Sequence, residues 1–150
     1  MPAADKVPAP RLGAFPAATP AETRALGRAV AEWVAAGDLL RLVGPLGAGK
    51  TLLTQGLAEG LGLDPAEVTS PTFILMQRHE GGRLPLVHVD LYRLAGREVE
   101  NLGLEEQVAD AVAAVEWGER LPAGYGRRRF RITIARQGTD RRLITITEEE

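Results

Sequence analysis

Residues 39–51, LLRLVGPLGAGKT, decide the fold of this 150-residue chain. Leu39–Val43 is a short apolar run, which is typical of a strand that is buried on both faces of a sheet. Gly44–Gly49 predicts a loop, and Lys50–Leu61 predicts a helix that carries leucines on one face. A buried strand, a glycine-rich loop and a helix in this order favour an α/β fold.

The loop matches the pattern GxxxxGK[ST] in full over Gly44–Thr51. Its glycines let successive backbone N–H groups point at one anion, and the helix that follows directs its N-terminal N–H groups at the same anion. Lys50 can reach the β- and γ-phosphates, and the hydroxyl of Thr51 can ligate Mg²⁺. We therefore predict a nucleotide–Mg²⁺ site formed by Gly44, Pro45, Leu46, Gly47, Ala48, Gly49, Lys50, Thr51 and Leu52.

Composition excludes several classes of function. The chain has 18 basic and 20 acidic residues and a formal net charge of −2, which excludes a dominant electrostatic attraction to nucleic acid or anionic lipid. It has no cysteine and only 2 histidines, so disulfide scaffolds, thiol nucleophiles and histidine-rich metal sites are excluded. Lys6 and Lys50 are the only lysines, so a lone ammonium group falls on the position that the loop requires.

Hydropathy gives no indication of a membrane protein. No window of 18 apolar residues could span a bilayer, and the N-terminus lacks the apolar region of a secretory signal. We therefore expect a cytoplasmic protein without membrane contacts.

Two carboxylates are candidates for the magnesium site. Asp90 stands near the end of the predicted strand Leu84–Leu91, and Glu116 ends the predicted strand Ala113–Glu116. Carboxyl ends of parallel strands meet at one edge of a sheet, where a phosphate-binding loop also lies. His88 lies on the same side of its strand as Asp90 and either orients Asp90, lines the site or belongs to the core. The alternatives are a surface aspartate that begins a turn and a surface or helix-capping glutamate.

The remaining segments predict one domain over residues 11–147, between a disordered leader at 1–10 and a solvated acidic tail at 148–150. We expect a P-loop NTPase-like three-layer sandwich, an α/β fold with a compact mixed parallel/antiparallel sheet. Its further predicted elements are an edge strand at Arg11–Pro16, a helix from Thr19-Pro20 to Gly37, a hairpin of Phe73–His79 with Leu84–Leu91, a helix within Glu98–Ala114, and a hairpin of Arg127–Ala135 with Arg142–Thr147.

Arg127–Arg131 (RRRFR) has two interpretations. A cluster of arginines is typical of a nucleic-acid contact, but in a strand these side chains alternate between the two faces. We favour a solvated hairpin face whose charges protect a sheet edge.

Two classes of phosphate-loop protein, GTPases and transporter ATPases, are excluded because their motifs are absent from the sequence. A guanine-reading Asn/Thr-Lys-x-Asp motif needs a lysine that this chain does not have, and the transporter signature LSGGQ does not occur. A small-molecule P-loop kinase remains an alternative, with an arginine-rich lid from Arg120–Arg131. A nucleotide-gated adaptor and a tRNA-binding module are further alternatives.

Four motifs in order resemble those of the TsaE family, the ATPase component of bacterial tRNA threonylcarbamoyladenosine synthesis. They are GPLGAGKT in the loop, SPTF at Ser70–Phe73, HVDLYRL at His88–Leu94 and VEWGERLP at Val115–Pro122. The resemblance extends from about Phe15 to Ala135. It implies an ATP hydrolase that binds ATP or ADP with Mg²⁺.

The resemblance also implies partners. TsaE proteins support TsaD and TsaB, which transfer a threonylcarbamoyl group to the adenosine that follows the anticodon in tRNAs reading A-starting codons. The chain would then meet tRNA indirectly, through that complex. We expect slow hydrolysis by the chain alone, because the sequence shows no arginine finger in cis.

Individual roles follow from the same resemblance. Lys50 and Asp90 are expected to be catalytic, with Asp90 positioning the attacking water. Thr51 and Glu116 are expected to ligate Mg²⁺. The segment Ser70–Phe73 is expected to act as a switch-like loop. Thr72 is expected to lie by the nucleotide, and Trp117 by the nucleotide or by the surface that meets the partners.

Overall fold

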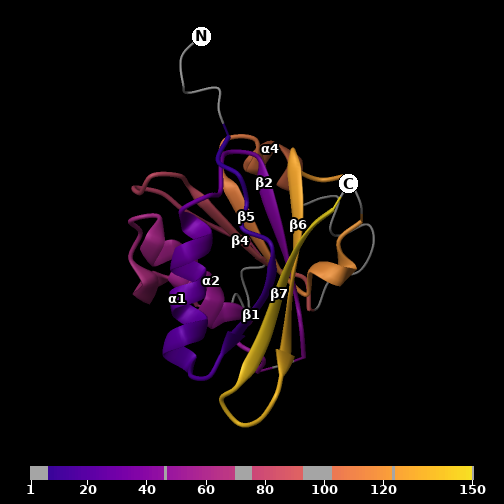
Figure 1. Ribbon diagram of the computed structural model, residues 1–150. Helices are drawn as coiled ribbons and strands as arrows, with labels where there is room; N and C mark the ends of the chain where they lie inside the picture. Colours follow the sequence, from indigo (N-terminus) through magenta and orange to yellow (C-terminus); the bar gives the residue numbers. More distant parts are fainter. Residues whose placement is uncertain (1–6, 46, 70–75, 93–102, 123, 150) are drawn as a thin grey trace.

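The computed structural model describes residues 7–45, 47–69, 76–92, 103–122 and 124–149. These residues form one seven-stranded sheet in the order β1-β7-β6-β2-β5-β4-β3 (Figure 1). The strands are β1 (Gly13–Ala17), β2 (Asp38–Val43), β3 (Met76–His79), β4 (Leu86–Asp90), β5 (Val112–Glu116), β6 (Arg128–Arg136) and β7 (Arg142–Glu149). The helices are α1 (Pro20–Ala31), α2 (Lys50–Gly60) and α4 (Leu104–Val108), with 3₁₀ turns η2 (Pro65–Glu67) and η3 (Gly118–Arg120).

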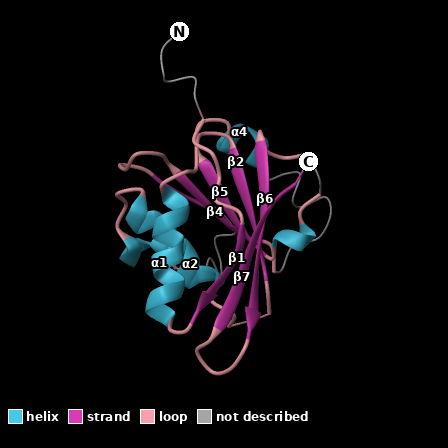
Figure 2. Cartoon of the chain, viewed as in Figure 1, coloured by secondary structure: helices cyan, strands magenta, loops and turns pink. Residues whose placement is uncertain are grey.

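The sheet is mixed, as the sequence predicts. Its four central strands β6, β2, β5 and β4 are parallel, and β7, β1 and β3 pair antiparallel at the two sides (Figure 2). Every residue of β5 is buried, which explains why the central strands read as apolar runs without alternation. The predicted α/β fold with a mixed parallel/antiparallel sheet is confirmed.

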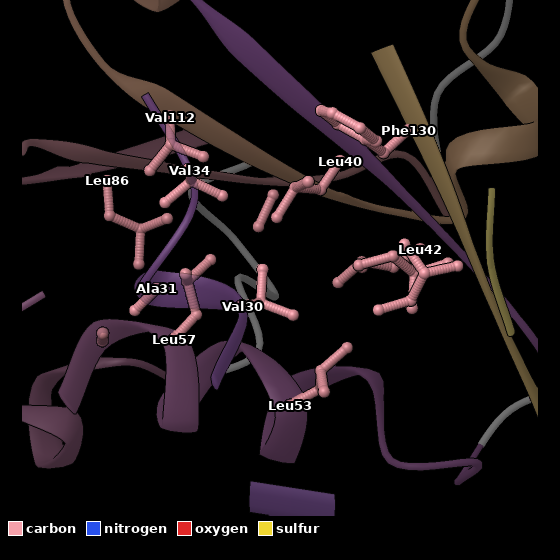
Figure 3. Packing of buried hydrophobic residues seen from close by; sticks show 14 of the residues in the cluster. Val30, Ala31, Val34, Leu40, Leu42, Leu53, Leu57, Leu86, Val112 and Phe130 are labelled. Atoms are coloured by element: carbon pink, nitrogen blue, oxygen red, sulfur yellow. The ribbon is translucent and has the colours of Figure 1, made fainter. Parts of the chain in front are cut away.

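Two apolar clusters hold the layers together. On one face of the sheet α1 and α2 cover the central strands, and Val30, Leu53 and Leu57 from these helices are buried against them (Figure 3). The opposite face packs against α4 and the segment around η3, through Leu104, Val108 and Leu121. Within the described ranges, no helix has the length and apolarity to cross a bilayer.

Helices α1 and α2 approach each other closely because glycines lie at their contact. A Cβ atom on Gly56 would lie 2.0 Å from the carbonyl oxygen of Arg24, and one on Gly27 would lie 2.2 Å from that of Leu53. Both neighbours are backbone atoms, which cannot turn away as a flexible side chain could. The position of the N-terminal end of α2, and of the loop before it, therefore depends on these glycines.

Replacing Gly56 by alanine is expected to destabilise the protein by about 2 kcal/mol, because the helices must separate. Helix propensity alone would favour alanine by about 1 kcal/mol. The sign of the change in stability therefore shows whether the close contact of the helices or helix propensity dominates. Thermal unfolding followed by circular dichroism should show a midpoint lowered by about 4–8 °C. An unchanged or raised midpoint would contradict the close approach of the helices.

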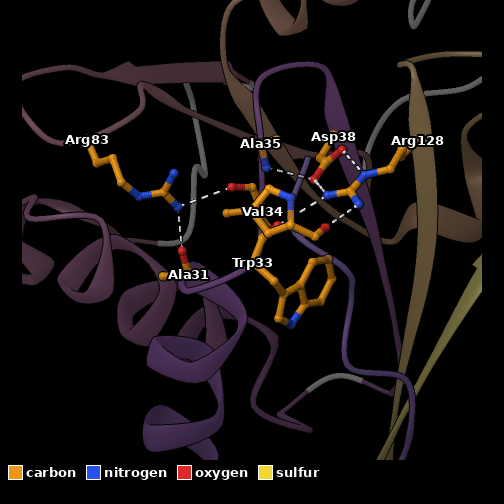
Figure 4. Close-up of polar contacts among 8 residues, drawn as sticks. Ala31, Trp33, Val34, Ala35, Asp38, Arg83 and Arg128 are labelled. Carbon is orange, nitrogen blue, oxygen red and sulfur yellow. Dashed lines mark hydrogen bonds and ion pairs between the residues drawn. The ribbon is translucent and has the colours of Figure 1, made fainter. Parts of the chain in front are cut away.

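The two ends of α1 differ in how well they are predicted. Thr19 caps the N-terminus as expected, accepting a hydrogen bond from the N–H of Glu22 at 3.2 Å. The predicted end at Gly37 is wrong, since the helix ends at Ala31. The distant Arg83 donates to the carbonyl of Ala31, the last residue of the helix, and to that of Val34, which lies beyond it (Figure 4).

A partly buried ion pair joins the start of β2 to β6. Arg128 donates from Nε to Oδ1 of Asp38 at 2.8 Å and from a terminal nitrogen to Oδ2 at 2.6 Å (Figure 4). The same guanidinium donates to the carbonyl of Trp33 at 3.2 Å. A bidentate geometry of this kind is the strongest form of the arginine–carboxylate contact.

The interpretation of Arg127–Arg131 as an edge is wrong. The predicted alternation is correct, because Phe130 and Ile132 are buried in the helix-side core. However, β6 lies inside the sheet between β7 and β2, so its arginines protect no edge. Strand order depends on long-range pairing that a local pattern does not encode.

The predicted acidic tail needs correction at residues 148 and 149, whereas residue 150 lies outside the described residues. Strand β7 continues through Glu149, whose Oε1 lies 3.0 Å from a guanidinium nitrogen of Arg41 on β2. Arg131 on β6 lies 3.7 Å from the other oxygen of the same carboxylate. These ion pairs favour an extended chain at residues where composition alone indicated a solvated tail.

Candidate functional site

The phosphate-loop motif lies at the carboxyl end of β2, as predicted. Gly49 has a φ of 113°, a conformation that favours glycine, and it is the N-cap of α2. Because glycine has no side chain, the cap makes no side-chain hydrogen bond to the first turn. The N-terminal N–H groups of α2 are therefore suited to bind an anion. Leu46 lies outside the described residues.

Lys50 is held beside the loop by weak partners. Its Nζ donates to the carbonyl oxygens of Gly44 at 2.6 Å and Pro45 at 3.4 Å, and lies 3.7 Å from the ring centroid of Trp117. The side chain is buried, and burial lowers its pKa from the usual lysine value, while Glu116, Glu119 and Asp90 oppose that shift. A phosphate oxygen would be a stronger partner for this ammonium group than carbonyls and a ring.

The two predicted carboxylates lie side by side. Strands β4 and β5 are parallel neighbours, and their register pairs Asp90 with Glu116 at the carboxyl edge. From α2, the hydroxyl of Thr51 donates toward Glu116, at 2.9 Å from Oε2 and 3.1 Å from Oε1. Oδ1 of Asp90 accepts a hydrogen bond from the N–H of Tyr92 at 2.9 Å. The structure thus brings the loop and both carboxylates to one place.

His88 contacts Glu116. Its Nε2 lies 2.5 Å from Oε2 of Glu116, and both side chains are buried. This contact agrees with the interpretation in which His88 lines the predicted site, and its complete burial agrees with the one in which it belongs to the core. A histidine that fixes a carboxylate in this way restricts the directions in which the carboxylate can bind a metal.

The donor set suits Mg²⁺ bound together with phosphates. Thr51 and Glu116 offer a hydroxyl and a carboxylate, which are hard oxygen ligands. Within the described part of the chain no three His, Asp or Glu side chains gather into a metal site. Mg²⁺ commonly binds through one or two protein ligands plus phosphate oxygens and water, so the pair is adequate for such a site.

Trp117 has an unusual backbone. Its φ of 58° is the only positive value among the described non-glycine residues, and such a conformation costs on the order of 1–3 kcal/mol. In this conformation the ring of Trp117 lies over the ammonium group of Lys50, and its centroid lies 5.1 Å from that of the Tyr92 ring. Strain of this kind gathers at functional sites, which agrees with the predicted place of Trp117 by the nucleotide.

The switch-like segment Ser70–Phe73, which includes Thr72, lies outside the described residues, as Leu46 does. The structure also shows a contact to the loop that the sequence did not predict. Arg142, which the sequence placed only in a hairpin, donates from Nε to the carbonyl oxygen of Ala48 at 2.8 Å. No local signal could have found this contact, because 94 positions separate the two residues.

Comparisons with known proteins agree with one another. A family model described as "Threonylcarbamoyl adenosine biosynthesis protein TsaE" matches residues 17–144. A TsaE protein of tRNA threonylcarbamoyladenosine biosynthesis from Streptomyces coelicolor is 48% identical over 132 residues, covering 83% of this chain and 88% of that protein. The protein of the same name from Bacillus subtilis is 43% identical over 129 residues, covering 85% and 80%. The crystal structure of Bacillus subtilis YdiB superimposes with a TM-score of 0.70 at 37% identity, covering 92% of this chain and 86% of that one.

Proposed function

Because the chain belongs to the TsaE family, we propose that it is a P-loop ATPase that binds and hydrolyses ATP with Mg²⁺ in tRNA threonylcarbamoyladenosine biosynthesis. The observation that carries the proposal is the contact of Thr51, in the first turn of α2, with Glu116 at the end of β5. It joins the hydroxyl of the motif to a buried carboxylate from another strand, which is the pairing that a nucleotide-bound Mg²⁺ requires.

Binding would use the loop and the residues next to it. Backbone N–H groups of the loop and of the first turn of α2 donate to phosphate oxygens, and Lys50 moves from its carbonyl partners to the β- and γ-phosphates. Thr51 and Glu116 would hold Mg²⁺, which when bound neutralises charge on the phosphates. The further contacts proposed for the nucleotide are those of Gly44–Leu52, Thr72 and Trp117.

Hydrolysis would depend on Asp90. Its carboxylate would accept a hydrogen bond from water and direct the water oxygen at the γ-phosphorus. The water oxygen forms a bond to the γ-phosphorus as the bond from that phosphorus to the bridging oxygen breaks. Asp90 accepts the proton that the water loses, and ADP and inorganic phosphate leave. Lys50 and the loop N–H groups stabilise the charge that develops on the phosphate oxygens.

We further propose that the chain supports TsaD and TsaB and hydrolyses ATP slowly on its own. Arginines near the site are already engaged: Arg120 donates to the carbonyl of Tyr92, and Arg142 donates to that of Ala48. These contacts hold both guanidinium groups within the domain, which supports slow hydrolysis by the chain alone. An arginine from a partner is worth a factor of roughly 10³–10⁵ in comparable enzymes.

The test combines turnover with assembly. Phosphate release by the purified chain is expected to rise at least about tenfold on adding TsaD and TsaB, because the partners complete the site. A pull-down with ATP, ADP or no nucleotide should show nucleotide-dependent capture of both partners. A high rate that the partners leave unchanged would contradict the proposal, and consumption of ATP that requires a second soluble substrate would favour the small-molecule kinase.

Direct RNA binding by Arg127–Arg131 is less well supported than the ATPase. Arg128 and Arg131 pair with Asp38 and Glu149, so part of their charge is neutralised within the domain. We propose that tRNA is met indirectly, through the partner proteins. Binding of tRNA by the chain alone, with a steep salt dependence, would contradict this.

A further inference from the structure

Arg142 connects the β6–β7 hairpin to the phosphate-binding loop. Its Nε donates to the carbonyl oxygen of Ala48 at 2.8 Å, and one terminal nitrogen lies 3.5 Å from that of Gly47. We propose that Arg142 is a positioning residue that holds this loop in the shape that receives phosphates. The inference rests on the proposed function, because it assumes that the loop binds a nucleotide.

Because the peptide bond is planar, the contact of Arg142 with the carbonyl of Ala48 also sets the direction of the next N–H, that of Gly49. In a trans peptide the C=O of one residue and the N–H of the next point in opposite directions. By holding the C=O of Ala48 toward β7, Arg142 directs the N–H of Gly49 away from β7. That N–H belongs to Gly49, the N-cap of α2, and a helix N-terminus is where an anion would bind. The peptide before it is held differently, because the N–H of Ala48 donates to the carbonyl of Pro45 at 3.0 Å.

The hairpin holds the guanidinium in place. The second terminal nitrogen of Arg142 donates to the carbonyl oxygens of Arg141 at 2.9 Å, Thr139 at 3.1 Å and Gly138 at 3.3 Å. The turn is closed by a hydrogen bond from the N–H of Gln137 to the carbonyl of Arg141 at 2.9 Å. Because the side chain is fixed from both sides, little conformational entropy is lost when the loop binds a ligand.

Charge supports a role in binding over a role in folding. Arg142 is directly opposite Arg136 in the antiparallel register, an arrangement of like charges that destabilises a sheet. Within the described part of the chain, its hydrogen bonds go to backbone carbonyls and it forms no ion pair with a carboxylate. Its positive charge beside the loop would therefore attract phosphate.

The test compares R142Q and R142K with R141Q. Arg141 is the exposed neighbour on the same hairpin, so R141Q removes the same charge without touching the loop. Calorimetric titration with ADP should show affinity lowered about tenfold in R142Q and about threefold in R142K, which keeps the charge but loses the planar fork. R141Q should stay within about twofold of the wild type, because exposed charges are screened by salt.

Steady-state hydrolysis distinguishes a role of Arg142 in positioning the loop from a general loss of folded, active protein. In R142Q the KM for ATP should rise about tenfold and kcat should fall less than KM rises, because the loop N–H groups contact phosphate oxygens in the ground state as well as in the transition state. Equal affinities of R142Q and R141Q would overturn the inference, and so would wild-type affinity in R142K, since charge alone would then suffice. Wild-type protein that binds no ADP would overturn the proposed function as well, whereas loss confined to R142Q and R142K supports both.

Discussion

Replacement of Lys50 by alanine is expected to abolish ATP binding at concentrations that saturate the wild-type protein, a loss of about a hundredfold or more in affinity. The ammonium group is the cation that the structure places beside Gly44 and Pro45 of the loop. It is buried, so its interaction with a phosphate oxygen would be screened little by water or salt.

The measurement is a thermal shift with and without nucleotide. ATP and Mg²⁺ should raise the unfolding midpoint of the wild type by mass action, and should leave that of Lys50→Ala unchanged. Lys50→Met is the matched variant, because methionine keeps a long unbranched side chain and lacks the ammonium group that lies over the ring of Trp117. Retained affinity in both variants would remove Lys50 from its proposed role.

Replacement of Asp90 by alanine is expected to stop hydrolysis while sparing nucleotide binding. A positioned general base contributes roughly 10²–10⁴-fold to a rate, so turnover should fall by about that factor. The affinity for ATP should change little, because Thr51 and Glu116, the pair proposed for Mg²⁺, contact each other without Asp90.

Single-turnover hydrolysis with saturating ATP tests this role, with binding measured separately by titration. Asp90→Asn keeps the shape of the side chain and its acceptor for the N–H of Tyr92, so it isolates the loss of charge. Asp110→Asn is the control, since it removes a carboxylate that pairs with Arg78 on the exposed surface. Unchanged turnover in Asp90→Asn would assign the catalytic carboxylate elsewhere.

The candidate site was predicted well where its parts are local in sequence. The loop, the start of α2 at Lys50 and the strand ends at Asp90 and Glu116 all follow from short patterns. Such patterns report backbone conformation and the face on which a side chain lies, and both are decided within a few residues. The roles proposed for these residues stay predictions.

The sequence predictions are wrong where a residue distant in sequence, rather than a local motif, decides the structure. The sequence predicts the end of α1 at Gly37, yet the helix ends at Ala31, and carbonyls at and after that end accept hydrogen bonds from the distant Arg83 and Arg128. Glu149 reads as part of a solvated tail, but its pairing with Arg41 on β2 makes it part of the sheet. In both cases the partner lies far away in the sequence, so no window contains it.

The sequence by itself determined that a buried strand, a phosphate loop and a helix follow one another, because contiguous residues decide each turn and face. Tertiary structure alone decided which strands are neighbours, and so brought Glu116 to Thr51 and His88 to Glu116. It likewise placed Arg142 against the loop. Strand order depends on burying the whole sheet at once, and that free energy belongs to no single segment of the chain.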